Sequence, residues 1–177
     1  MRSVMQTERP PAPAVAESLS GVAPGSGPGV DSVWCLERRV LPQHTDHAGV
    51  MWHGAYIGWL EEARVEALAA AGLAYCDLSA RGLELPVVSL SIDYRQALLH
   101  GETVWIRSEV SPRQGVKLPW RSRFVRADGL VAAEARVDLV LVNMAAGGGR
   151  RRLVRRLPRD LEQAVARLTA GPTRRWL

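Results

Sequence analysis

The spacing of apolar residues along the chain predicts one long helix. In GAYIGWLEEARVEALAAAG (residues 54–72) they recur every three or four positions, which is the spacing of one helical face. The residues of this stripe are Tyr56, Trp59, Leu60, Ala63, Ala67, Ala70 and Ala71. Gly72 predicts where the helix ends. Ile57, Val65 and Leu68 fall outside the stripe, so we expect other elements to cover the helix from more than one side.

Strand-forming residues, mostly alternating between apolar and polar, predict five strands around this helix. The predicted strands span residues 33–41, 86–98, 102–110, 116–126 and 130–143. We expect a loop over residues 73–85 and a short helix over residues 159–170, and Pro119 predicts a sheet edge or a bulge in its strand. Short connections between successive strands make them antiparallel neighbours. The order therefore predicts an α+β fold, and its long open strand edges favour oligomers.

The two ends of the chain differ in composition from its centre. Residues 1–31 are rich in Pro, Ala, Gly and Ser without any period, which predicts a disordered extension. We expect one ordered domain over residues 32–170 and a basic tail over residues 171–177. No signal peptide or apolar run of about 18 residues is recognisable, so we expect a cytoplasmic protein without a membrane span.

Positive charge is concentrated near the C-terminus. The whole chain has a formal net charge of +5, whereas residues 150–177 hold nine arginines against Asp160 and Glu162. The remainder is therefore slightly acidic. A basic segment contacts phosphate groups or is simply solvated, and both interpretations stay open. Only Trp176 accompanies these arginines, so nucleic acid is not the partner we expect.

The stretch HTDHAGVMWH (residues 44–53) holds three of the four histidines and has three interpretations. His44, Asp46 and His47 resemble the end of a histidine-rich metal motif, but Pro42 stands where that motif needs a ligand, so we expect no metal. Asp46 and Gly49 are also typical of a turn before a helix. Alternatively, a carboxylate beside a helix N-terminus can activate water while the free N–H groups stabilise an oxyanion.

The longer stretch QHTDHAGVMWHGAYIGWLEEARVEAL resembles the signature of the 4-hydroxybenzoyl-CoA thioesterase-like hotdog family, of the YbgC type. The matching residues are Thr45, Asp46, Gly49, Val50, His53, Tyr56, Glu62, Ala63 and Arg64. Weaker matches follow in SIDYRQAL (residues 91–98) and in residues 137–143, so the resemblance covers about residues 33–165. It implies a hotdog fold, in which an antiparallel sheet wraps around one long central helix. It also implies a homodimer or homotetramer with active sites between subunits.

The resemblance further implies an acyl-CoA thioesterase without a cofactor, because the coenzyme A moiety is part of the substrate. Asp46 would act as nucleophile or general base, and a backbone N–H at or near His53 would polarise the thioester carbonyl. The His53 side chain either takes part in the chemistry or packs at the helix start. The residues expected to bind substrate are Thr45, Gly49, Val50, Trp52, Tyr56 and Trp59, with Arg150, Arg151 and Arg152 on the phosphates. The alternative is a non-catalytic protein that binds acyl-CoA or an acyl carrier.

The chain also departs from the family pattern at four positions. His44 replaces the first aspartate, Trp52 replaces the commoner tyrosine, and Gly54 replaces an asparagine. The proline expected after Tyr94 is absent, and Ala97 stands near its place. None of these changes removes the carboxylate, so they concern the acyl group, which the pattern leaves open as aliphatic or aromatic.

Overall fold

The computed structural model describes residues 33–144 and 151–172. Its helices are η1 (Pro42–His44, a 3-10 helix), α1 (His53–Ala70), α2 (Tyr75–Ala80) and α3 (Arg159–Ala170). Its strands are β1 (Trp34–Arg39), β2 (Leu83–Glu84), β3 (Val87–Tyr94), β4 (Thr103–Val110), β5 (Lys117–Arg126), β6 (Val131–Val140), β7 (Val142–Asn143) and β8 (Arg152–Leu153). The predicted N-terminal extension and most of the predicted basic tail lie outside these residues. No helix in the described part of the chain is long and apolar enough to cross a membrane.

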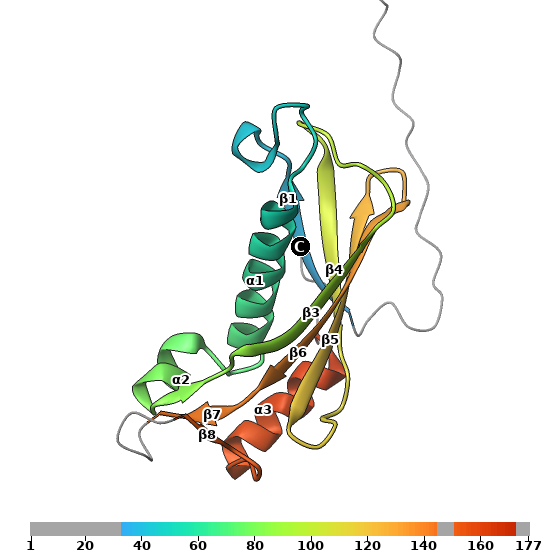
Figure 1. Cartoon of the computed structure of the whole chain (residues 1–177). Coiled ribbons are helices and arrows are strands. Elements are labelled where there is room, and N and C mark those ends of the chain that lie inside the picture. The colour runs from blue at the N-terminus through green and yellow to red at the C-terminus, as the bar shows by residue number, and fades with distance from the viewer. Residues whose placement is uncertain (1–32, 145–150, 173–177) are drawn as a thin grey trace, which may run out of the picture.

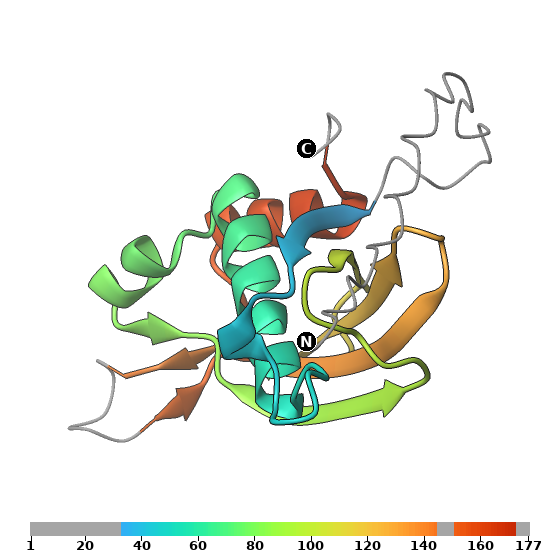
Figure 2. The same ribbon diagram turned by 90° about the horizontal axis from the view of Figure 1, so that it is seen from above.

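One antiparallel sheet of five strands curves around one side of α1 (Figures 1 and 2). Its strand order is β1-β4-β5-β6-β3, so β1 and β3 are the edges. The register aligns one row of residues across the whole sheet, namely Leu36, Ile106, Phe124, Ala133 and Tyr94. Most of this row is buried beneath α1, whereas Tyr94 on the edge strand is 53% exposed. The predicted α+β arrangement of one sheet around one long helix is therefore confirmed.

The two halves of α1 pack into separate parts of the core. Its N-terminal half contributes Tyr56, Trp59 and Leu60 to a cluster with the middle of the sheet. Its C-terminal half contributes Ala67, Leu68 and other residues to a second cluster, which α2 and α3 complete. The short sheet β2-β7-β8 adjoins this second cluster. Each end of α1 therefore has different surroundings, and only the N-terminal end reaches the loop that holds Asp46.

The predicted helix is confirmed, but two of its residues differ from the predicted burial pattern. Leu68, outside the predicted stripe, is fully buried because α2 and α3 cover the helix on that side. This agrees with the expectation that several elements surround α1. Ala70, in the predicted stripe, is exposed. Ile57 remains 45% exposed near the N-terminal end of the helix.

Four other predictions about elements need correction. The short connection between β3 and β4 does not make them neighbours, because β3 pairs with β6 at one edge of the sheet while β4 lies between β1 and β5. The predicted loop over residues 73–85 contains α2 and β2, which are too short to show a period. The predicted strand over residues 130–143 is interrupted at Leu141 and forms β6 and β7. Neither the edge nor the bulge predicted at Pro119 is found there, because β5 is the central strand of the sheet and its register shift lies between Phe124 and Val125. Pro119 is tolerated there because it lies opposite Ser111, one residue beyond the end of β4, and it still accepts the Ser111 N–H at 3.0 Å.

Candidate functional site

The loop between η1 and α1 folds as a tight turn around Asp46. One carboxylate oxygen, Oδ1, accepts the backbone N–H groups of Ala48 at 2.8 Å and Val50 at 3.2 Å. The backbone N–H of Asp46 donates to the Val50 carbonyl at 2.9 Å, and Gly49 has a φ of 75°. The turn interpretation of this motif is therefore confirmed. The turn is compatible with a chemical role for Asp46. Its hydrogen bonds use only Oδ1, and the residue is exposed, so Oδ2 is accessible to a substrate.

His44 has a structural place in this loop. Its Nδ1 accepts the Leu41 N–H at 3.1 Å, and its ring stands edge-on to Trp59 with 5.1 Å between centroids. Within residues 33–144 and 151–172, no three His, Cys, Asp or Glu side chains lie close enough to hold a metal ion together. His44 therefore fixes the start of the loop, next to the buried part of α1.

The N-terminus of α1 follows directly and presents unpaired donors. Trp52 is the N-cap residue and provides no side-chain hydrogen bond. The Ala55 N–H donates to the Trp52 carbonyl at 3.0 Å, whereas among the described residues the N–H groups of His53 and Gly54 have no acceptor. Unpaired N–H groups and the helix dipole make this end of a helix attractive to negative charge.

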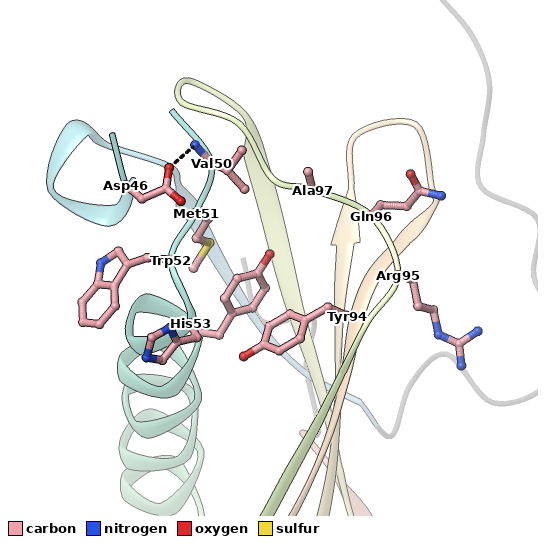
Figure 3. A pocket seen from close by; sticks show the side chains of 10 residues that line it. Asp46, Val50, Met51, Trp52, His53, Tyr94, Arg95, Gln96 and Ala97 are labelled. Atoms are coloured by element: carbon pink, nitrogen blue, oxygen red, sulfur yellow. Dashed lines mark hydrogen bonds between the residues drawn. The ribbon is translucent and has the colours of Figure 1, made fainter. Parts of the chain in front are cut away.

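A cavity of about 420 Å³ joins the loop, the helix N-terminus and the end of β3 (Figure 3). Five predicted site residues line it, namely Asp46, Val50, Trp52, His53 and Tyr56. Five further residues complete the lining, namely Met51, Tyr94, Arg95, Gln96 and Ala97. In Figure 3 the Asp46 side chain lies beside the start of the helix, with Tyr94 and Gln96 across the cavity. The cavity thus has a carboxylate and helix donors on one side and the open edge of the sheet on the other.

Aromatic rings dominate the cavity's inner wall. Tyr56 is 2% exposed and stands edge-on to Tyr94 and to Phe124, with ring centroids 5.1 and 5.0 Å apart. Burial, and then the nearby Tyr94 and Glu102, raise the pKa of Tyr56 to about 12. Desolvation also raises the pKa of Tyr94. Both phenols are therefore neutral at physiological pH, and Tyr94, which is 53% exposed, offers ring surface to a ligand.

The structure does not bring every predicted site residue to this cavity. Thr45 donates its hydroxyl to the Pro42 carbonyl at 2.9 Å, and Trp59 is buried behind the loop at 2% exposure. Gly49 shapes the turn, and its carbonyl accepts the His100 N–H at 3.3 Å. These residues support the loop and do not line the cavity.

Two of the three predicted phosphate-binding arginines lie away from the cavity. Arg152 is in β8 and Arg151 directly precedes it; β8 lies near the C-terminal end of α1 (Figure 1), whereas the Asp46 loop precedes its N-terminal end. Arg151 is 3.9 Å from a Glu84 carboxylate oxygen. Arg150 lies outside the described residues. The role of all three on phosphate groups stays a prediction, and within one chain Arg151 and Arg152 do not border the cavity.

The segment Tyr94–Ala97 was not among the predicted site residues. The Met51 N–H donates to the Leu98 carbonyl at 2.8 Å, and Val50 forms a bridge with Leu99. These bonds join the Asp46 loop to the chain that follows β3. The one available signal was the resemblance over residues 91–98, which marked the strand and gave no contact with the loop.

Comparisons with known proteins identify the family. A family model described as the thioesterase-like superfamily matches residues 40–167. The provisionally named esterase sll0410 of Synechocystis sp. is 38% identical over 131 residues, 73% of this chain and 76% of that protein. The acyl-CoA thioester hydrolase YbgC of Escherichia coli O6:H1 is 28% identical over 105 residues, 59% of this chain and 78% of its own.

The fold is also similar to that of a solved thioesterase. The DHNA-CoA thioesterase of Staphylococcus aureus superposes with a TM-score of 0.67 at 22% identity, covering 76% of this chain and 89% of that one. At this identity the likeness concerns the fold alone. It confirms the predicted hotdog arrangement, in which an antiparallel sheet wraps around one long helix.

Proposed function

Because the chain belongs to the thioesterase-like superfamily, we propose that it hydrolyses an acyl-CoA thioester to a free acid and coenzyme A. Relatives named as thioester hydrolases and acyl-CoA thioesterases support the enzyme class. The observation that carries the proposal is the cavity itself. Asp46 lines it together with His53, the first residue of α1, whose backbone N–H has no acceptor among the described residues.

In the proposed reaction, the Asp46 carboxylate promotes nucleophilic attack on the thioester carbonyl carbon by one of two routes. It either takes a proton from water as the water attacks, or attacks directly and forms an anhydride that water then opens. In both routes the carbonyl oxygen becomes an oxyanion, and the His53 N–H donates to it. The carbon–sulfur bond then breaks and the coenzyme A thiolate leaves. A thiolate needs little help from a general acid, and neither route uses a cofactor.

The local structure favours this role for Asp46. Hydrogen bonds from Ala48 and Val50 to Oδ1 fix the orientation of the carboxylate while leaving Oδ2 without a backbone donor among the described residues. A carboxylate that is already oriented loses little conformational entropy when it reacts. Asp46 is exposed in a single chain, so we expect a further element to shield the site from bulk solvent while leaving room for the reacting water.

We propose that a second copy of the chain supplies that element. The edge strand β3 pairs with β6 on one side only, and Val88, Leu90 and Tyr94 are 52%, 39% and 53% exposed. An open strand edge with exposed apolar residues is a liability unless another chain covers it. Tyr94 also lines the cavity, so pairing at β3 would bring the second copy next to the site. A monomer mass in sedimentation velocity at micromolar concentration would contradict this assembly.

The test of the proposed activity compares Asp46→Asn with the wild type in thiol release from short, long and aromatic acyl-CoAs. Asparagine keeps an oxygen for the turn but has no charge, so we expect turnover to fall by about 10²- to 10⁴-fold. The matched control is Asp128→Asn. Asp128 accepts the Leu130 N–H at 3.0 Å in a similar turn and does not line the cavity.

The two variants separate chemistry from folding. We expect Asp128→Asn to keep the wild-type rate, and both variants to keep the wild-type circular dichroism spectrum. A near-normal rate for Asp46→Asn would refute the proposed role. Binding of acyl-CoA without turnover by the wild type would favour the non-catalytic binding protein.

A further inference from the structure

A basic surface lies on the segment that begins just before β8 and ends at the start of α3 (Figure 1). Five of its nine residues, 151–159, are arginines, and all five are exposed. They are Arg151, Arg152, Arg155, Arg156 and Arg159. None of them lines the cavity beside Asp46. Within one chain, this basic surface is therefore separate from the proposed catalytic site.

The apolar residues of the segment hold its arginines outward. Val154 and Leu157 are half-buried and pack against the core cluster that α2 and α3 complete. The Val154 N–H also donates to the Leu141 carbonyl at 2.9 Å. Because Val154 and Leu157 face the core, the charged side chains around them face the solvent. The basic surface is therefore part of the folded domain and has a fixed position on it.

Few carboxylates neutralise the basic surface. Arg151 is 3.9 Å from a Glu84 carboxylate oxygen, whereas the other four arginines form no ion pair within residues 33–144 and 151–172. Asp160, which follows the segment directly, is paired with Arg81 at 2.7 Å. The chain before residue 150 is slightly acidic. Positive potential is therefore concentrated on one side of the domain, where it attracts anions.

An apolar side chain is exposed among these charges. Leu153 is 42% exposed and lies in β8, an edge of the short sheet β2-β7-β8. A charged residue such as Arg152 on an edge strand prevents pairing with another chain. That explanation does not cover the arginines at 155, 156 and 159, which lie beyond the strand, and it leaves the exposed leucine without a purpose. A partner that offers both negative charge and an apolar layer accounts for all of these residues.

We infer that the basic surface docks the protein on an anionic lipid bilayer. Guanidinium groups bind the headgroup phosphates, and Leu153 enters the boundary between headgroups and acyl chains. Each basic residue near an anionic bilayer strengthens binding about fivefold. Nucleic acid would also bind the arginines but has no use for Leu153, and residues 151–159 include no aromatic ring to stack on bases. The inference is independent of the proposed thioesterase function.

The experiment measures cosedimentation of the full-length protein with vesicles made of equal parts phosphatidylglycerol and phosphatidylcholine. We expect binding to these vesicles at low salt, loss of binding as added NaCl screens the charges, and no binding to vesicles of phosphatidylcholine alone. The double variant Arg155→Gln and Arg156→Gln should bind the anionic vesicles about 25-fold more weakly, which is fivefold for each arginine.

A matched control removes the same charge elsewhere. Arg121 and Arg136 are exposed and lie opposite each other in β5 and β6, far from β8 in the sequence and in a different sheet. The double variant Arg121→Gln and Arg136→Gln should bind the vesicles almost as the wild type does. Leu153→Ser keeps every charge and should weaken binding about fivefold, because the apolar contact is lost.

Several results would overturn the inference. They are failure of the wild type to bind the anionic vesicles, an equal loss of binding in the two double variants, and wild-type binding by Leu153→Ser together with equally tight binding of duplex DNA. A raised KM for a water-soluble acyl-CoA in the Arg155→Gln and Arg156→Gln variant, with unchanged vesicle binding, would assign these arginines to the substrate instead. Absence of thioester turnover would refute the proposed function and leave the vesicle result standing.

Discussion

The two ends of α1 have opposite local structures. At the C-terminal end, the Ala71 N–H donates to the Ala67 carbonyl at 3.0 Å, and Gly72 leaves the helix with a φ of 82°. Arg167 of α3 donates from Nε to the Ala71 carbonyl at 3.0 Å. At the N-terminal end, no side chain caps the helix, and the N–H groups of His53 and Gly54 are unpaired in the described chain.

This difference shows how stability and chemistry are divided along one helix. The C-terminal half is buried against α2 and α3, where Leu68 and Leu168 are fully buried. Packing at that end stabilises the helix and compensates for the unpaired N–H groups at its N-terminal end. A capping side chain at the N-terminal end would stabilise α1 but would occupy the donors that the proposed oxyanion needs.

Among changes to the two ends of α1, the largest effect is expected from removing one backbone donor at the N-terminal end. His53→Pro deletes the backbone N–H of the first helical residue, a position where proline is well tolerated. Trp52 already has φ −79° and ψ 152°, the conformation favoured before proline. We expect kcat to fall by about 10²- to 10³-fold with little change in stability.

The control for this substitution is His53→Ala, which removes the imidazole and keeps the N–H. If the backbone carries the effect, His53→Ala retains most of the activity, as measured by thiol release. If both substitutions reduce kcat equally, the imidazole takes part in the chemistry and the donor assignment is wrong. This pair of variants therefore decides between the two interpretations of His53.

The sequence predicted the features that depend on nearby residues and missed those that depend on contacts between distant segments. α1 and β3–β6 are long enough for a period to appear, and the residues of the Asp46 loop are near one another in the sequence. Tyr94 and the three residues after it reach the cavity through bonds between Met51 and Leu98 and between Val50 and Leu99. No local pattern encodes those contacts. The arginines near residue 151 were chosen by charge alone, which gives no position in space.

A smaller effect is expected from weakening the C-terminal end. Arg167→Met keeps most of the side-chain volume but removes the hydrogen bond and positive charge at the last carbonyl groups of α1. We expect the free energy of unfolding to fall by about 1–2 kcal/mol in denaturant titrations, with kcat per folded molecule unchanged. Arg159→Met, on the exposed surface of the same α3, should have almost no effect. Equal losses of stability would show that the contact with α1 is not the cause.

The smallest effect concerns Tyr56, one turn into α1 from the open end. Its pKa is raised to about 12 in the folded chain by burial, compared with about 10 when unfolded. The resulting stabilisation is complete below pH 10 and is lost as the pH rises from 10 to 12, because the unfolded state releases its proton first. Between pH 9 and 11 we expect the free energy of unfolding of the wild type to fall by about 1 kcal/mol more than that of Tyr56→Phe. Parallel pH profiles for the two proteins would mean that the phenol is not shielded from water, and that the N-terminal half of α1 is more open than the burial of Tyr56 indicates.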